Sequence, residues 1–204
     1  MVLEMEPNPR KTRAFRNLGQ VDISALKAAV MQITEDQWNK ENADKPNRFE
    51  ALDVTSHIVF RFVSNFRDWR DSYDRPLWRE WKHLLLPVME AATADYGYAK
   101  GEYPRVMLAR MAAGGVIKPH RDANPAAKWP HKIHIPIITN DQVLFRVEGA
   151  QFTMLEGEAV EVNNMGVHSV ENNGSTVRIN LIFEYYDTDQ PSPDWLTDVL
   201  SAQR

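Results

Sequence analysis

After Gly97 the chain consists of short alternating runs of apolar and polar residues, interrupted by Gly, Pro or Asn roughly every ten residues. A period of two buries one face of a strand, and frequent turn residues join such strands as antiparallel neighbours. This density of strands predicts a sandwich or barrel, and a double-stranded β-helix, the cupin-like jelly roll, fits best. The predicted strands lie near 105–111, 115–120, 131–138, 142–148, 151–155, 158–163 and 176–186.

The first hundred residues follow a different pattern, in which apolar residues recur three and four positions apart. Asp22 is placed as the N-cap of a helix that closes before Thr34, and 76–96 reads as a second helix. Pro87 inside the second helix predicts a kink or a split. Between the helices, alternation over 57–63 predicts one strand. The fold class expected is therefore mainly β, with a helical N-terminal half packed against the jelly roll.

These patterns divide the chain into regions of a single domain. The N-terminal stretch is polar and carries Lys11 among several basic residues, which favours a loose, solvated arm. The regions expected are a flexible arm (1–20), a helical and mixed support region (21–100), the double-stranded β-helix core (101–187) and a C-terminal tail (188–204).

Composition excludes several classes of function. With 24 Lys and Arg against 28 Asp and Glu, the net charge of -4 argues against nucleic acid as a partner. The absence of cysteine excludes disulfides, thiolate metal sites and cysteine nucleophiles, so the chemistry must use N and O ligands. No run is apolar and long enough to span a membrane, and the N-terminus lacks an apolar signal segment. We expect a cytoplasmic protein with a small-molecule substrate, and the oligomeric state stays open.

A candidate metal site lies in the sequence KPHRDANP. His120 and Asp122 are two residues apart, so in a strand they share one face and both reach a single metal ion. His168, in the turn NNMGVHSV, is the candidate third ligand. Two imidazoles and one carboxylate leave coordination positions open, which favours non-haem Fe(II) over structural zinc. Taken alone, this motif is also explained by an ordinary surface turn.

An arginine follows ten residues after the last of these candidates. In the sequence TVRINLIFEYY, Val177, Ile179 and Leu181 form one apolar face, whereas Arg178 and Asn180 point the other way. An arginine on the inner face of a closed barrel needs a permanent anion. A dicarboxylate cosubstrate that chelates the metal at one end would meet Arg178 at the other.

In this order the motifs resemble the aspartyl/asparaginyl β-hydroxylase-like family of Fe(II)/2-oxoglutarate-dependent oxygenases, which includes bacterial proline cis-4-hydroxylases. The resemblance covers residues 105–186. Several elements in register are more specific than the three ligands alone. The elements are PHRD at 119–122, KIHIPI with His134, the pair Gly157 and Glu158, His168, and Arg178.

The resemblance implies roles for individual residues. The three candidate ligands would bind Fe(II), and Arg178 would bind the 5-carboxylate of 2-oxoglutarate. His134 would position the cosubstrate near the metal, and Lys132, where the family often has arginine, would contact an anion. Ala109 stands where some members have a serine that assists the arginine, so that hydrogen bond is missing or supplied otherwise. The intact Asp122 favours hydroxylation over halogenation.

Two further residues are candidates for substrate contact. Arg110 precedes His120 by ten residues, and we expect it to contact a carboxylate or to pair with an acid such as Glu158. Trp129 is expected to cap the site from the proline-rich loop that leads to His134.

The other histidines have simpler interpretations. His83 is expected on the surface of the second helix. His131 and His134 are three residues apart, so in a strand they cannot both point inward. His57 shares a polar strand face with Arg61, which indicates either a solvated, salt-bridged face or the mouth of a substrate site.

The function implied by the resemblance is that of a 2-oxoglutarate-dependent dioxygenase with Fe(II), 2-oxoglutarate and O2 as cofactors. It would hydroxylate an unactivated C–H bond of a small molecule, such as an amino acid or related carboxylate, and release succinate and CO2. The alternatives are a non-catalytic jelly-roll module that binds a small organic acid or sugar, and a hydroxylase of Asp or Asn side chains in a peptide or protein.

Overall fold

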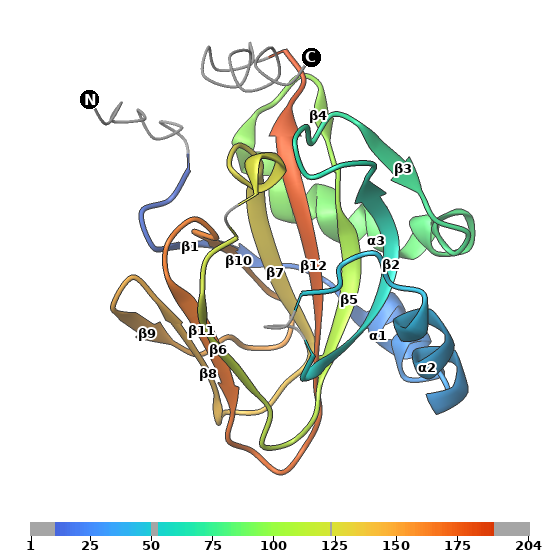
Figure 1. Cartoon of the computed structure of the whole chain (residues 1–204), viewed down its shortest axis with the longest axis vertical. Coiled ribbons are helices and arrows are strands. Elements are labelled where there is room, and N and C mark those ends of the chain that lie inside the picture. The colour runs from blue at the N-terminus through green and yellow to red at the C-terminus, as the bar shows by residue number, and fades with distance from the viewer. Residues whose placement is uncertain (1–10, 50–52, 123, 190–204) are drawn as a thin grey trace.

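Two antiparallel β-sheets face each other in the structure, a computed structural model that describes residues 11–49, 53–122 and 124–189 (Figure 1). The chain is mainly β, as the alternating patterns predicted. In spatial order the larger sheet contains β1 (Phe15–Gln20), β10 (Glu158–Val162), β7 (His131–Ile138), β12 (Arg178–Asp187), β5 (Val106–Met111), β2 (Thr55–Val63) and β3 (Ser72–Asp74), with β4 (Gly101–Glu102) paired to β12. The smaller sheet contains β6 (Val116–His120), β11 (His168–Asn172), β8 (Val143–Val147) and β9 (Ala150–Phe152).

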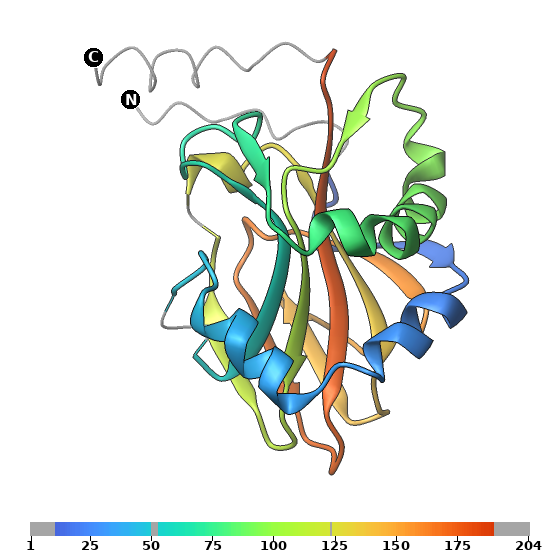
Figure 2. The ribbon, with the colours of Figure 1, turned by 90° about the vertical axis from the view of Figure 1, so that its right-hand side faces the viewer.

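Helices cover the outer face of the larger sheet (Figure 2). They are α1 (Ser24–Val30), α2 (Glu35–Ala43) and α3 (Trp78–Thr93), followed by a 3₁₀ turn at Ala94–Tyr96. Leu26, Trp38 and Met89 from these helices join Ile135 and Leu181 of the sheet in the main hydrophobic core. Burial of this apolar surface is the main stabilising contribution to the fold. None of the helices in the described residues is long and apolar enough to cross a membrane.

Strand β12 at the centre of the larger sheet sends alternate side chains to opposite faces. Ile179, Leu181 and Phe183 enter the core under the helices. The intervening side chains face the space between the two sheets, and they are Arg178, Asn180, Ile182 and Glu184. The inner face of the barrel is therefore free to carry polar groups, because the outer face supplies the apolar burial.

Most strands of the C-terminal half were predicted, but β4 and β11 were not, and His168, which was expected in a turn, begins β11. Every predicted range overlaps an observed strand, and the bounds differ by only a few residues. Alternation was an accurate guide here because both faces of these strands meet well-defined environments, a core on one side and the barrel interior on the other.

The N-terminal half is mixed rather than mainly helical, since β1, β2 and β3 all belong to the larger sheet. Part of the predicted flexible arm forms β1 and pairs with β10. β1 was missed because it is an edge strand with exposed side chains, which leaves no apolar alternation in the sequence. Lys11, expected in solvent, donates to the carbonyls of Ala127, Lys128 and Pro130. Residues 1–10 of the arm and 190–204 of the tail lie outside the described residues.

The helix predictions need two corrections. The first helix ends at Val30, and a separate helix, α2, begins after Thr34 with a capping box. Thr34 Oγ1 accepts from the backbone N–H of Gln37, and the Gln37 side chain accepts from the backbone N–H of Thr34. The sequence signal for α2 was therefore this capping box rather than an apolar stripe. α3 runs through Pro87 as one helix, so of the two predicted outcomes, a kink or a split, the split is wrong.

A buried carboxylate, that of Glu161, connects β1, β7, β10 and the 3₁₀ turn that follows α3. Glu161 accepts from Arg16, from Tyr96 Oη at 2.9 Å and from His131 Nδ1 at 2.7 Å. Tyr98 Oη lies 2.7 Å from the other ring nitrogen of His131. Burial alone would raise the pKa of Glu161, but these hydrogen bonds, led by that from His131, lower it below its ordinary value.

Replacement of Glu161 by Gln is expected to lower the free energy of unfolding by about 1–3 kcal/mol at neutral pH, since it weakens a buried charged network. Because the folded pKa is lowered, this stabilisation is complete above the unfolded pKa, about 4.3, and is lost as the pH falls through the folded value. Urea unfolding of both proteins between pH 3 and pH 8 measures the difference. Glu171→Gln, which removes a more exposed pair with Arg146, is the control. A difference that does not shrink at low pH would contradict this account.

Candidate functional site

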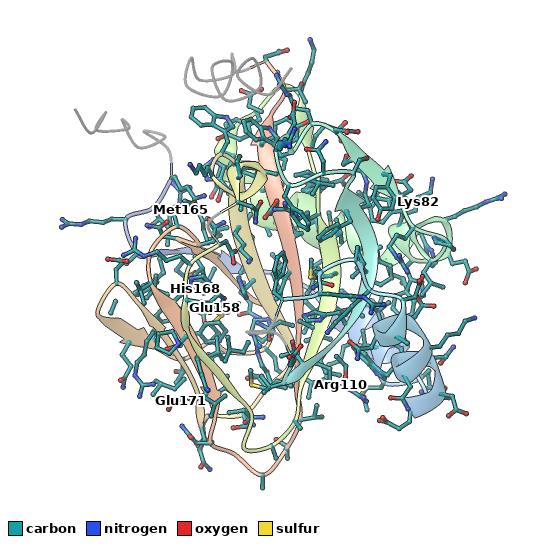
Figure 3. All side chains as sticks on the ribbon, in the orientation of Figure 1. Lys82, Arg110, Glu158, Met165, His168 and Glu171 are labelled. Carbon is teal, nitrogen blue, oxygen red and sulfur yellow. The ribbon has the colours of Figure 1, made fainter. Side chains whose placement is uncertain are left out.

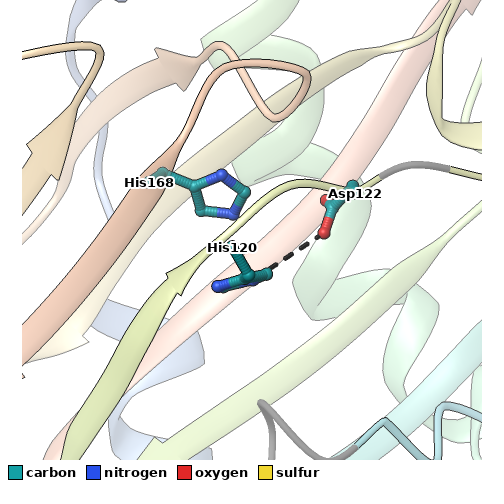
Figure 4. A group of neighbouring side chains, drawn as sticks. All are labelled: His120, Asp122 and His168. Carbon is teal, nitrogen blue, oxygen red and sulfur yellow. Dashed lines mark ion pairs between the residues drawn. The ribbon is translucent and has the colours of Figure 1, made fainter.

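The three predicted metal ligands come together at one end of the smaller sheet (Figure 4). His120 ends β6, Asp122 follows it, and His168 begins β11. β6 and β11 are antiparallel neighbours in which His120 and His168 are register partners, so strand pairing itself places the two rings 4.3 Å apart between centroids. One ligand atom from each residue lies within 4.8 Å of the others. This is a facial arrangement of two imidazoles and one carboxylate.

Backbone carbonyls orient both imidazoles. His120 Nδ1 lies 2.8 Å from the carbonyl oxygen of Lys118, and His168 Nδ1 lies 3.0 Å from that of Gly166. A carbonyl only accepts, so each Nδ1 carries the proton and each Nε2 presents its lone pair. The neighbouring Asn163 and Asn164 side chains bond to other backbone groups instead.

The electrostatics around Asp122 keep it ionised. Burial alone would raise its pKa, but the ammonium of Lys132, in an ion pair with it, and the two imidazoles hold the pKa well below its usual range. Burial lowers the pKa of His168 to about 4. Neutral imidazole and ionised carboxylate are the states that a divalent metal requires, so the residues present fit Fe(II).

Arg178 lies on the inner face of the larger sheet and is only 2% exposed. Its Nε and Nη2 atoms have no hydrogen-bond partner within the described part of the chain, and its Cζ lies 5.0 Å from the centroid of the Phe145 ring. Burial lowers the pKa of Arg178, to about 9, so the guanidinium still carries its charge at neutral pH. A buried cation without a partner is unfavourable, and an anionic ligand would relieve it.

His134 lies on the same inner face, where it is the register partner of Ile182 on β12. Its ring packs edge-on against Phe145, with 5.8 Å between centroids, and its Nδ1 has no partner among the described residues. Burial, reinforced by Lys132 and Arg178, lowers its pKa well below the ordinary value. The ring is therefore neutral and has hydrogen-bonding capacity to offer a ligand. His131, as predicted, points to the opposite face and bonds to Glu161.

A pocket opens beside the metal ligands and reaches Asp122. Phenyl rings form one wall, in which Phe66 packs against Phe49 and Phe62 at centroid distances of 5.5 and 5.9 Å. A buried ion pair between Arg105 and Glu184 lies on another side. The polar lining consists of Asn47, His57, Arg105, Asp122, Asn124, Lys132 and Glu184.

The structure places both candidate substrate-contact residues, Arg110 and Trp129, away from the pocket lining. Arg110 pairs with an acid, as one of its two expected roles required, but the acid is Glu35 rather than Glu158. Arg110 points to the helix side of the larger sheet, because its neighbour Ala109 occupies the inner face (Figure 3). There it pairs with Glu35 of α2 and lies 4.6 Å from the centroid of the Trp38 ring. Trp129 stacks on Trp69, with 6.3 Å between centroids. It packs against a small hydrophobic cluster that includes Trp69 and Tyr186, and it does not line the pocket.

Several residues at the site were not identified as candidates from the sequence. Asn47 and the Arg105–Glu184 pair line the pocket, and Asn180 lies between Arg178 and the pocket wall. For Asn180 and Glu184 the signal was present, since both share the face of Arg178 in an alternating strand. Asn47 lies in irregular chain, where no periodicity marks direction.

His168→Ala is expected to weaken Fe(II) binding by more than about 100-fold, because loss of a ligand should exceed the roughly 10–100-fold loss seen when an outer-shell partner is removed. Anaerobic titration calorimetry measures the affinity. His83→Ala, on the exposed face of α3, is the matched control and should bind like the wild type. Equal affinity in both variants would rule out this site.

Solved structures share the fold. A 2OG-Fe(II) oxygenase-family oxidoreductase from Burkholderia pseudomallei has a TM-score of 0.53 at 15% identity, over 82% of this chain and 91% of that chain. AviO1 from Streptomyces viridochromogenes Tue57 has a TM-score of 0.54 at 16% identity, over 88% and 93% of the two chains. The α-ketoglutarate-dependent epimerase SnoN from nogalamycin biosynthesis has a TM-score of 0.55 at 10% identity, over 85% and 78%. At these identities the likeness establishes the fold alone.

The family itself is established by sequence. No curated protein matches the chain. The model of the aspartyl/asparaginyl β-hydroxylase family matches residues 28–188, which include the candidate ligands, Arg178 and every strand of the two sheets except β1. The match thus extends well beyond 105–186, into the region that the sequence motifs did not assign. The chain therefore belongs to the aspartyl/asparaginyl β-hydroxylase family of Fe(II)- and 2-oxoglutarate-dependent oxygenases, as its sequence motifs predicted.

Proposed function

We propose that the protein hydroxylates an unactivated C–H bond of a small molecule, an amino acid or a related carboxylate. In the overall reaction one oxygen atom of O2 enters the substrate as hydroxyl, and the other enters succinate as 2-oxoglutarate loses CO2. The observation that carries the proposal is the combination, on one barrel interior, of a His–Asp–His ligand set with a buried arginine that lacks an anion.

In this proposal His120, Asp122 and His168 would hold the iron through two imidazole nitrogens and one carboxylate oxygen. Fe(II) bound there supplies the activation of O2 that drives decarboxylation of the 2-oxo acid and oxidation of the substrate. Lys132 keeps Asp122 anionic through their ion pair. The carbonyls of Lys118 and Gly166 fix the imidazoles in the tautomer that a metal needs.

Arg178 binds the 5-carboxylate of 2-oxoglutarate, which supplies the anion that the buried guanidinium lacks. His134, neutral and on the same face, positions the cosubstrate between Arg178 and the metal. A dicarboxylate held at both ends has one orientation, so its reacting end meets the metal in a fixed geometry.

The pocket supports a small, net-neutral substrate. Its two cationic residues, Arg105 and Lys132, are balanced by Asp122 and Glu184, so a zwitterionic amino acid adds no uncompensated charge. The phenyl wall offers an apolar surface to the substrate's carbon skeleton and excludes water from it. We therefore propose a free small molecule as the substrate, with an Asp or Asn side chain of a peptide as the alternative that the substrate panel tests.

The first test is an anaerobic titration of metal-free protein with Fe(II) and then 2-oxoglutarate, followed by absorbance of the weak visible charge-transfer band of the chelated 2-oxo acid. The band should appear in the wild type and be absent in His120→Ala. Succinate release is then measured with a panel of free amino acids and with Asp- and Asn-containing peptides. Release with peptides alone would replace the small-molecule proposal, and absence of the band in folded protein would favour a non-catalytic binding module.

Arg178→Ala should leave Fe(II) binding intact and weaken 2-oxoglutarate binding. Removing one partner of a buried charge pair costs about 2–5 kcal/mol, so the Kd for 2-oxoglutarate should rise at least about 30-fold. Calorimetric titration of the Fe(II)-loaded protein measures it. Arg110→Ala, on the opposite face of the same sheet, should bind 2-oxoglutarate like the wild type. An unchanged Kd in Arg178→Ala would remove the assigned carboxylate site.

A further inference from the structure

Asn180 carries an amide that the folded chain leaves unpartnered. Its side chain is fully buried, at 0% exposure, and neither Nδ2 nor Oδ1 has a hydrogen-bond partner among the described residues. Buried polar atoms in folded proteins are nearly always paired, so an amide with both atoms unpaired needs a specific explanation.

The neighbours of Asn180 in the sheet provide no hydrogen-bond partner for its amide. Its register partners are Ala109 on β5 and Pro136 on β7, and neither has a polar side-chain atom. His57, next to Ala109 on β2, already lies 3.3 Å from Thr55 Oγ1 and 3.4 Å from Lys45 Nζ through its two ring nitrogens. The Asn180 amide therefore lies in a row of the sheet where only a ligand or a water can form hydrogen bonds with it.

The position of Asn180 points to the ligand. It lies on the inner face of β12 between Arg178 and Ile182, and Ile182 is the register partner of His134. Phe145, on the opposite sheet, contacts both the guanidinium of Arg178 and the ring of His134. The unpartnered nitrogens of Arg178, the unpartnered Nδ1 of His134 and the amide of Asn180 thus belong to one polar strip.

We propose that Asn180 is a second contact for the distal carboxylate that Arg178 binds, with its Nδ2–H donating to a carboxylate oxygen. This inference rests on the proposed function, in which that carboxylate is the 5-carboxylate of 2-oxoglutarate. Arg178 supplies the charge, and the amide supplies a directed neutral donor from the same strand. Together they select a ligand with a carboxylate at this end of the strip.

Substitution by Leu, which has a similar shape and no polar atom, separates this role from a structural one. In Asn180→Leu the Kd of the anaerobic Fe(II)-loaded protein for 2-oxoglutarate should rise about 10-fold. The Kd for 2-oxobutanoate, a 2-oxo acid without the distal carboxylate, should change less than about twofold, because the lost contact is not made. Asn180→Asp should bind 2-oxoglutarate more weakly than Asn180→Leu, since it sets a carboxylate against a carboxylate.

Stability of the ligand-free protein gives an independent readout. Removal of an unpaired buried amide should leave the Tm of Asn180→Leu unchanged or raise it by about 2–4 °C. Asn172→Leu is the matched control, because Asn172 is also buried but donates to the carbonyls of Ala112 and Thr176, so its Tm should fall. If Leu does not pack at position 180, the same binding test is made with Asn180→Ala.

The outcomes are distinct. A wild-type protein that does not bind 2-oxoglutarate overturns the proposed function and this inference with it. A wild type that binds, with Asn180→Leu and Asn180→Ala binding equally well, overturns only the inference. Equal loss of both 2-oxo acids together with a lowered Tm would assign Asn180 to the packing of the barrel, through a buried water, and would also overturn it.

Discussion

The two-residue period of the central strands is the constraint on which the rest of the molecule depends. In β12 and β7 every second side chain enters the core under the helices, as Leu181 and Ile135 do, and every other one faces the barrel interior, as Arg178 and His134 do. A shift of one residue in register would exchange the two sets and bury the polar groups under the helices. Stability and chemistry are thus divided between the faces of one sheet, and the antiparallel pairing that sets the register serves both.

The same period explains what the sequence could predict. Most strands of the C-terminal half and the facing of Arg178 follow from alternation, although β11 was not predicted. The candidate ligand set follows from the chemistry of His120, Asp122 and His168. β1 could not be found, since an exposed edge strand carries no apolar alternation. Arg110 was considered for the pocket, but it faces the helices. Its neighbour Ala109 pairs with Asn180 of β12 and occupies the inner face, and the sequence of β5 alone does not show this. Contacts between distant segments, such as Lys11 with the carbonyls at Ala127 to Pro130, have no local signal at all.

In the barrel interior the protein keeps unpaired polar groups that lower its stability and can bind a ligand. Arg178, His134 and Asn180 all hold unpartnered polar atoms in buried surroundings, whereas Glu161, on the other side of the sheet, has its oxygens bonded by several neighbours. Glu161 therefore stabilises the fold, whereas the three residues of the barrel interior have hydrogen-bonding capacity for a ligand. Ala109 on β5 has no side-chain hydrogen-bond donor. Its register partner Asn180 provides an amide donor on the neighbouring strand β12.

The imidazoles of His120 and His168 take their orientation from the backbone carbonyls of Lys118 and Gly166, each two residues before its histidine. A carbonyl is present whatever amino acid occupies the position, so the groups that aim the ligands are encoded by chain geometry rather than by side-chain identity. Substitution of Lys118 would therefore leave its aiming carbonyl in place, so position 118 can change in sequence over evolution, or be redesigned, while the ligand geometry is inherited. Position 166 is more restricted, because a Cβ there would lie 2.5 Å from Cγ of Glu148, so a side chain at this position requires Glu148 to move.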